Sequence, residues 1–129
     1  MSAFRKKPTD AELAILRVLW ARGPSTVRQI AEVMAEAGRE TGYTTVLKLL
    51  QIMTEKRLVV RDETARTHVY EAAYTQDQTQ RQLVTDLLDR VFDGSAAQLV
   101  LQALAATKTS PEELAEIRKL LAAKTGGER

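Results

Sequence analysis

The sequence predicts a mainly α-helical protein in which a helix-turn-helix precedes a small two-stranded β wing. N-cap residues and glycine stops bound two amphipathic helices within residues 9–38. Residues 42–57 carry apolar side chains at helical spacing, and residues 58–70 contain two short β-prone runs. This order of elements is that of a winged helix-turn-helix. We therefore expect a winged-helix domain in residues 1–74 and a C-terminal helical dimerisation region in residues 75–129.

The first helix is predicted over Thr9–Arg22. Thr9 is a good N-cap residue, and Glu12, three residues later, completes a capping box. Gly23-Pro24 ends the helix, because Pro cannot continue the ladder of backbone hydrogen bonds. The buried side of this helix is expected to consist of Leu13, Leu16, Leu19 and Trp20.

The second helix is predicted to run from an N-cap at Ser25 or Thr26 to about Ala37, where Gly38 stops it. Its inward side chains are Val27, Ile30 and Met34. Arg28 lies on the outward side near the first turn, where the unpaired amides of a helix N-terminus and a cation favour the same anion. Arg28 is therefore either a ligand for a phosphate oxygen or a solvated surface residue.

The third helix, predicted over Gly42–Arg57, has two different faces. Its apolar stripe consists of Val46, Leu49, Leu50 and Met53, at positions i, i+3, i+4 and i+7. Thr44, Lys48 and Gln51 lie opposite, and small polar groups near the start of a helix suit the major groove of DNA. An ordinary solvated helix surface would show the same pattern. Tyr43, where the helix begins, either donates its hydroxyl to a phosphate or packs its ring.

The two β-prone runs, Leu58–Arg61 and Thr67–Tyr70, are predicted to pair as a wing. Arg61 and Arg66, on or near the turn between them, would reach the DNA backbone or the minor groove. His68 is the only histidine, so the chain has no histidine-rich metal site. We expect His68 to pack in the fold or to contact a phosphate rather than to act as a catalyst.

Three short helices are predicted after residue 75. Thr75 and Gln78 form a capping box for the first of them, Gly94-Ser95 separates it from the second, and Ser110-Pro111 begins the last. Helices of this size bury too little surface to enclose a core alone, so we expect them to form a homodimer. The expected dimerisation residues are Leu83, Val84, Leu87, Leu88, Val91, Phe92, Leu99, Val100, Leu104, Ile117, Leu120 and Leu121.

Charge and composition limit the class of function. Residues 1–70 hold 12 Lys and Arg against 8 Asp and Glu, whereas residues 71–129 hold 7 against 9, so the winged half is the basic one. The chain has no cysteine and no apolar run of membrane-spanning length. It also lacks phosphate-binding loops and an evident set of nucleophile and base. We expect a cytoplasmic binding protein that is not an enzyme and uses no cofactor or metal.

The sequence resembles the penicillinase-repressor (BlaI/MecI/CopY) family of bacterial transcriptional repressors in three stretches. They are ELAILRVLWARGPSTVRQIAE, GYTTVLKLLQIMTEKRLVVRDETARTHVYEA and LVLQALAATKTSPEELAEIRKLLAAK. The resemblance implies a homodimer that binds a palindromic operator in double-stranded DNA and dimerises through its C-terminal helices. It also implies repression that ends when the C-terminal region is inactivated, in many members by a regulatory protease.

The resemblance assigns roles to particular positions. Thr44, Thr45, Lys48 and Gln51 match the DNA-reading face of the recognition helix, Tyr43 matches its entry, and Arg66 and His68 match the wing. Together with the residue-based analysis, the predicted DNA-binding residues are Arg28, Tyr43, Thr44, Thr45, Lys48, Gln51, Lys56, Arg57, Arg61, Arg66 and His68.

Three departures from the family pattern are visible. Arg57 stands where the family often has a glycine, and an Arg in a left-handed helix cap costs about 1 kcal/mol relative to Gly. Gln102-Ala103 replaces the Asn-Phe pair of members cleaved by a protease, so that route of induction is not supported. The absence of cysteine removes the copper-sensing cluster of another branch.

We conclude from the sequence that the protein is a dimeric winged-helix repressor. One alternative is a winged-helix regulator that responds to a small molecule, which would need a pocket between the winged domain and the C-terminal helices. The other is an adaptor that uses the winged fold to bind proteins and does not bind DNA.

Overall fold

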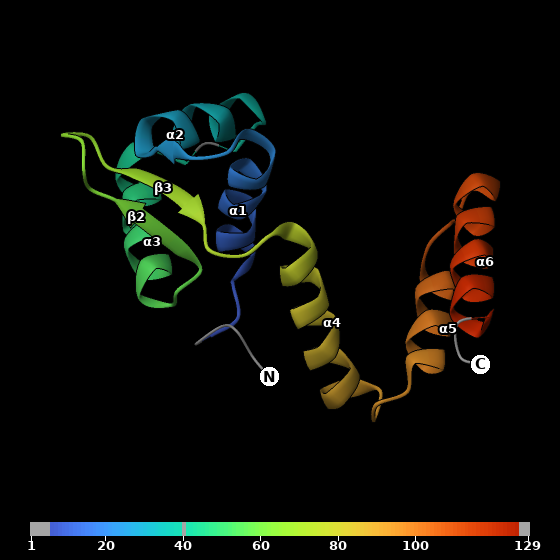
Figure 1. Cartoon of the computed structure of the whole chain (residues 1–129). Coiled ribbons are helices and arrows are strands. Elements are labelled where there is room, and N and C mark those ends of the chain that lie inside the picture. Colours follow the sequence, from blue (N-terminus) through green and yellow to red (C-terminus); the bar gives the residue numbers. More distant parts are fainter. Residues whose placement is uncertain (1–5, 40, 127–129) are drawn as a thin grey trace. The chain divides into compact units, whose positions relative to one another are not determined.

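The computed structural model describes residues 6–39 and 41–126 of the chain. The chain divides into two compact units between Thr85 and Asp86. The first unit contains α1 (Asp10–Arg22), β1 (Ser25–Thr26), α2 (Val27–Glu36), α3 (Tyr43–Glu55), β2 (Val59–Asp62) and β3 (Val69–Ala72) (Figure 1). The division falls inside α4 (Gln76–Val91), and α5 (Ala96–Ala106) and α6 (Pro111–Gly126) belong to the second unit. Residues 127–129 of the predicted dimerisation region lie outside the described residues.

Capping boxes begin the first two helices. Thr9 Oγ1 accepts a hydrogen bond from the Glu12 amide at 3.2 Å, and Glu12 Oε1 accepts one from the Thr9 amide at 2.9 Å. Thr26 and Gln29 make the same reciprocal pair at the start of α2, at 3.2 and 2.9 Å. Thr26 is therefore the N-cap of α2. Ser25 is instead buried, and its hydroxyl donates to the Gly23 carbonyl at 2.8 Å.

The core of the winged unit lies where α1, α2 and α3 pack together with the small sheet (Figure 1). On α1 the prediction was partly wrong: Leu13 and Trp20 are only half-buried, whereas Ile15 and Val18 are buried. Trp20 packs against the edge of the core because its indole Nε1 donates to the Tyr74 carbonyl at 3.0 Å. The buried apolar residues are Ala14, Ile15, Leu16, Val18, Leu19, Val27, Ile30, Met34, Val46, Leu50, Met53, Leu58, Val59 and Tyr70.

The sheet has three antiparallel strands in the order β1-β3-β2, where the sequence predicted a two-stranded wing. The missing strand, β1, has only two residues, too few to show an alternating pattern, and it pairs Ser25 with Tyr70. The hairpin pairs Arg61 with Tyr70. Both of its strands begin slightly later than predicted. His68 consequently lies in the loop before β3 and not in a strand.

The α-helices after β3 bury few side chains. Thr79 on α4 is buried, and Leu83 packs against the winged core, which explains why the first unit extends to Thr85. The described residues of α5 and α6 include none that is buried. In the part of the chain that the structure describes, we find no helix with both the length and the apolar character needed to cross a membrane.

Helices α2 and α3 end in the same hydrogen-bonded motif with different residues. In α2, Gly38 adopts a φ of 88°, and the Arg39 amide donates to the Met34 carbonyl at 2.9 Å. In α3, Arg57 adopts a φ of 65°, and the Leu58 amide donates to the Met53 carbonyl at 2.9 Å. This is the Schellman arrangement, in which glycine usually occupies the left-handed position. The predicted left-handed cap at Arg57 is therefore confirmed.

The two matched helix ends generate a prediction about stability. Arg57→Gly should raise the free energy of unfolding by about 1 kcal/mol, because glycine adopts the left-handed conformation without the steric cost of a Cβ. Gly38→Ala should lower it by a similar amount, since no atom within 4 Å would contact the new Cβ and only the backbone cost remains. Urea denaturation of both variants measures these changes. A loss of stability in Arg57→Gly would mean that the Arg57 side chain makes a stabilising contact.

Candidate nucleic-acid interface

Helix α3 presents one polar face to solvent. Val46, Leu50 and Met53 have no exposed surface, which fixes the rotation of the helix about its axis. The residues on the other side, Thr44, Thr45, Lys48 and Gln51, are all exposed. Packing of the apolar stripe therefore holds the four predicted DNA-reading side chains on the outer surface of the unit.

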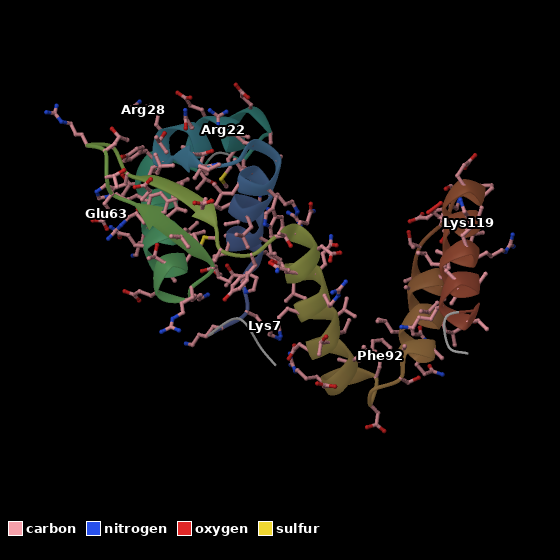
Figure 2. The ribbon with its side chains drawn as sticks, viewed as in Figure 1. Lys7, Arg22, Arg28, Glu63, Phe92 and Lys119 are labelled. Carbon is pink, nitrogen blue, oxygen red and sulfur yellow. The ribbon has the colours of Figure 1, made fainter. Side chains whose placement is uncertain are left out.

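A hollow of about 350 Å³ lies beside the N-terminal end of this face. It is bounded by the starts of α2 and α3 and by the loop before β3, and its lining includes Arg28, Tyr43, Leu47, Arg66 and His68. The guanidinium carbon of Arg28 lies 5.9 Å from the centre of the Tyr43 ring, which is a cation–π contact. Arg28 projects from the α2 side of the unit (Figure 2). Four predicted DNA-binding residues from three separate segments thus meet in one hollow.

The electrostatics of this hollow favour an anion. The first turns of α2 and α3 contain no acidic residue. Gly42, the N-cap of α3, has no side chain that could accept from the first-turn amides. Two positive helix ends therefore face the same region as the guanidinium groups of Arg28 and Arg66.

Arg61 is exposed on the wing and pairs with a neighbouring carboxylate. Its Nε donates to Glu63 Oε2 at 2.6 Å, and Glu63 lies on the hairpin (Figure 2). Hydrogen bonds to the side chains of Tyr70 and then Glu63 raise the pKa of Arg61 above its ordinary value. Arg61 is thus already engaged within the wing, whereas Arg66 lines the hollow. The sequence analysis missed Glu63, although its position two residues after Arg61 was a usable signal.

Lys56 and Arg57 lie at the opposite end of α3 from the hollow. The intervening helix of 13 residues spans about 20 Å at a rise of about 1.5 Å per residue. Lys56 Nζ lies 2.8 Å from Glu12 Oε1, and the exposed fractions of the two side chains are only 16% and 2%. Lys56 is thus half-buried in an ion pair at the end of α3 away from the hollow, and its contact with a phosphate stays a prediction. Arg57 is exposed and lines a separate hollow beside β2.

The predicted dimerisation residues differ in exposure. Leu83 packs on the winged core and is therefore occupied within its own unit. Leu88, Phe92, Leu99 and Ile117 are half-buried. The exposed members are Val84, Leu87, Val91, Val100, Leu104, Leu120 and Leu121, and Leu101, which was not predicted, is exposed as well.

Among residues 6–39 and 41–126, no group of three or more His, Cys, Asp or Glu side chains is arranged to hold a metal ion.

The fold and the polar, cationic surface define a winged-helix protein of the transcription-regulator class. A family model described as the penicillinase repressor matches residues 8–123. The transcriptional regulator BlaI of Mycobacterium tuberculosis, found in the strains CDC 1551 and H37Rv, is 36% identical over 93 residues. The match covers 71% of this chain and 67% of the relative. The chain belongs to the penicillinase repressor family of transcriptional repressors.

The wing turn generates a prediction about pH. Asp62 Oδ1 accepts hydrogen bonds from the Thr64 amide at 2.9 Å and the Thr64 hydroxyl at 2.8 Å, and these bonds lower the pKa of Asp62 below 3.8. A lowered pKa means that the ionised carboxylate stabilises the turn above the ordinary pKa. This stabilisation is lost as the pH falls through the lower, folded value.

An NMR titration of the Thr64 amide should therefore show a midpoint below pH 3.8. In Thr64→Ala the backbone donor remains and the hydroxyl is lost, so the midpoint should rise but stay below the ordinary value. A wild-type midpoint at or above the ordinary value would contradict the proposed turn.

Proposed function

We propose that the protein is a homodimeric repressor that binds a palindromic operator through α3 and the wing. The observation that carries this proposal is the cationic hollow formed by α2, α3 and the wing loop, directly beside the exposed polar face of α3. Phosphate contacts position a protein on DNA, and side chains in the groove read the bases. The two surfaces supply both kinds of contact.

The hollow would hold a backbone phosphate. Arg28 and Arg66 provide guanidinium donors, and the Tyr43 hydroxyl and the His68 ring provide further polar contacts. The start of α3 adds amide groups that no N-cap side chain engages. A phosphate held there would bring the first turns of α3 to the edge of the major groove.

The exposed face of α3 would read the bases. Lys48 can donate to guanine O6 or N7, and Gln51 can form a bidentate pair with adenine. The hydroxyls of Thr44 and Thr45 can donate or accept, and their methyl groups suit contact with a thymine methyl. Lys56 does not belong to this surface, because its ammonium is paired with Glu12.

A second copy of the chain would cover the apolar side chains of the second unit. α5 has no buried residue, although it is largely apolar, and α6 carries exposed Leu120 and Leu121. Burial of such side chains in a dimer is favourable by roughly 1.5–3 kcal/mol each. Two identical winged units joined in this way would read two half-sites of a palindrome.

Gln102 and Ala103 are exposed but lie within the continuous helix α5. They offer a protease neither the Asn-Phe pair nor an extended segment. We therefore do not propose that a protease ends repression by cleaving the chain between Gln102 and Ala103.

Operator binding is tested by selecting genomic DNA fragments on the purified protein at about 0.15 M salt and sequencing them. We expect enrichment of a dyad whose half-sites are about one helical turn apart. If two protomers neutralise roughly eight phosphates, log affinity should fall with log salt at a slope of about −7. Recovery of no common motif from a folded dimer would favour the adaptor alternative.

Lys48→Ala tests whether Lys48 reads the bases of the selected dyad. It should weaken binding to the selected dyad by about 1–3 kcal/mol per half-site while changing binding to random DNA little. Lys108→Ala is the matched control, because Lys108 is exposed in the loop between α5 and α6. Equal losses for the two variants would remove Lys48 from the base-reading surface.

The dimer is tested by placing a charge on the apolar face of α5. Leu104→Glu should raise the dimer dissociation constant at least 100-fold, because a buried, unpaired carboxylate is costly. Gln102→Glu places the same charge on an exposed polar position of α5 and should leave the constant nearly unchanged. Sedimentation equilibrium measures both. A Leu104→Glu variant that remains a dimer would exclude this face as the interface.

A further inference from the structure

The Glu12–Lys56 ion pair joins the first turn of α1 to the C-cap residue that follows α3. Lys56 Nζ donates to both carboxylate oxygens of Glu12, at 2.8 and 3.0 Å. Glu12 Oε1 also accepts from the Thr9 amide. One carboxylate therefore caps α1 and holds the C-terminal end of α3 at the same time.

The Glu12–Lys56 pair is shielded from solvent. Glu12 is 2% exposed and Lys56 is 16% exposed, whereas Arg81 and Asp77, for example, form a pair on the helix surface at 78% each. Exposed pairs contribute little to stability, while a charge left unpaired after burial is costly. The hydrogen-bonded geometry of a shielded pair also allows fewer arrangements than an apolar contact would.

The opposite end of α3 is held by apolar packing of Val46 and by the contact between Arg28 and the Tyr43 ring, not by a side-chain cap. Its N-cap is Gly42, which makes no side-chain hydrogen bond, and the residues beside it belong to the open hollow. At the C-terminal end, Lys56 is paired with Glu12, and the Leu58 amide closes the Schellman motif onto Met53. The apolar stripe thus fixes the rotation of α3 about its axis, while the ion pair ties its C-terminal end to the start of α1.

We propose that Glu12 and Lys56 are positioning residues for the recognition helix: their ion pair sets the direction in which α3 enters the major groove. Lys56 acts through Glu12 and does not contact phosphate. This inference rests on the proposed function, since it concerns how α3 is presented to an operator. It predicts that breaking the pair reduces discrimination between operator and random DNA, with little change in the number of phosphates contacted.

Fluorescence anisotropy with the selected dyad and with a random duplex, over a range of salt, tests this inference. Glu12→Gln keeps an acceptor for the Thr9 amide but removes the partner charge of Lys56. We expect its affinity for the dyad to fall at least tenfold, its affinity for random DNA to change less than twofold, and its salt slope to match wild type. Lys56→Met should behave in the same way, and Lys56→Arg, which can still pair with Glu12, should stay within twofold of wild type.

The alternative in which Lys56 contacts phosphate predicts a different pattern. Lys56→Met would then weaken binding to both duplexes and reduce the salt slope by about one unit per protomer. Glu12→Gln would release the ammonium and strengthen binding to both. Either result would overturn the inference. Arg17→Gln, an exposed charge change on α1, should leave discrimination unaltered and serves as the control.

A purely structural role must be distinguished from positioning. The DNA affinity of each variant is therefore measured well below its melting temperature, and circular dichroism confirms its helical content. A lower melting temperature with an unchanged ratio of dyad to random affinity would overturn positioning.

The double variant Glu12→Gln/Lys56→Met gives a second test: with neither charge left unpaired, its loss of discrimination should be smaller than the product of the single losses. If the wild type itself shows no preference for any sequence, the proposed function fails and this inference fails with it.

Discussion

The burial of one apolar stripe of α3 is the interaction on which the rest of the winged unit depends. Val46, Leu50 and Met53 are fully buried, and each contributes roughly 1.5–3 kcal/mol relative to exposure. Because side chains repeat every 3.6 residues, burying this stripe directs Lys48 and Gln51 outward. The same packing therefore stabilises the unit and presents its polar face.

The two ends of α3 serve different purposes. The N-terminal end lies in a hollow lined by Arg28 and Arg66, without an acidic residue in its first turn. This arrangement favours an anion but adds little to stability in its absence. The C-terminal end carries the ion pair of Lys56 and the left-handed cap at Arg57. The polar tether to α1 thus lies at the end of the helix that is remote from the proposed ligand, while apolar packing extends along the helix.

The second unit, unlike the winged unit, is rich in apolar side chains but buries few of them. The described residues of α5 and α6 include many leucines but no buried residue, so these helices lack a complete core within one chain. A helix pair alone buries too little surface to offset its ordering entropy. The proposed second copy would supply the missing burial, which is why dimerisation and DNA binding form one proposal.

Local signals in the sequence determined the helices and their ends, because capping boxes, glycine stops and the 3.6-residue spacing act within a few residues. Thr9 with Glu12 and the cap at Arg57 were predictable for this reason. Only the tertiary structure decided which distant side chains pair with the basic residues. Lys56 has the same local sequence signals as the other basic residues, but its partner Glu12 is set by packing. Glu12 lies 44 residues from Lys56, and Tyr70 reaches Arg61 only through strand pairing. Sequence periodicity carries no information about contacts between distant segments, so the pairing of Lys56 with Glu12 and the approach of Tyr70 to Arg61 required the fold, whereas Glu63 was a local signal.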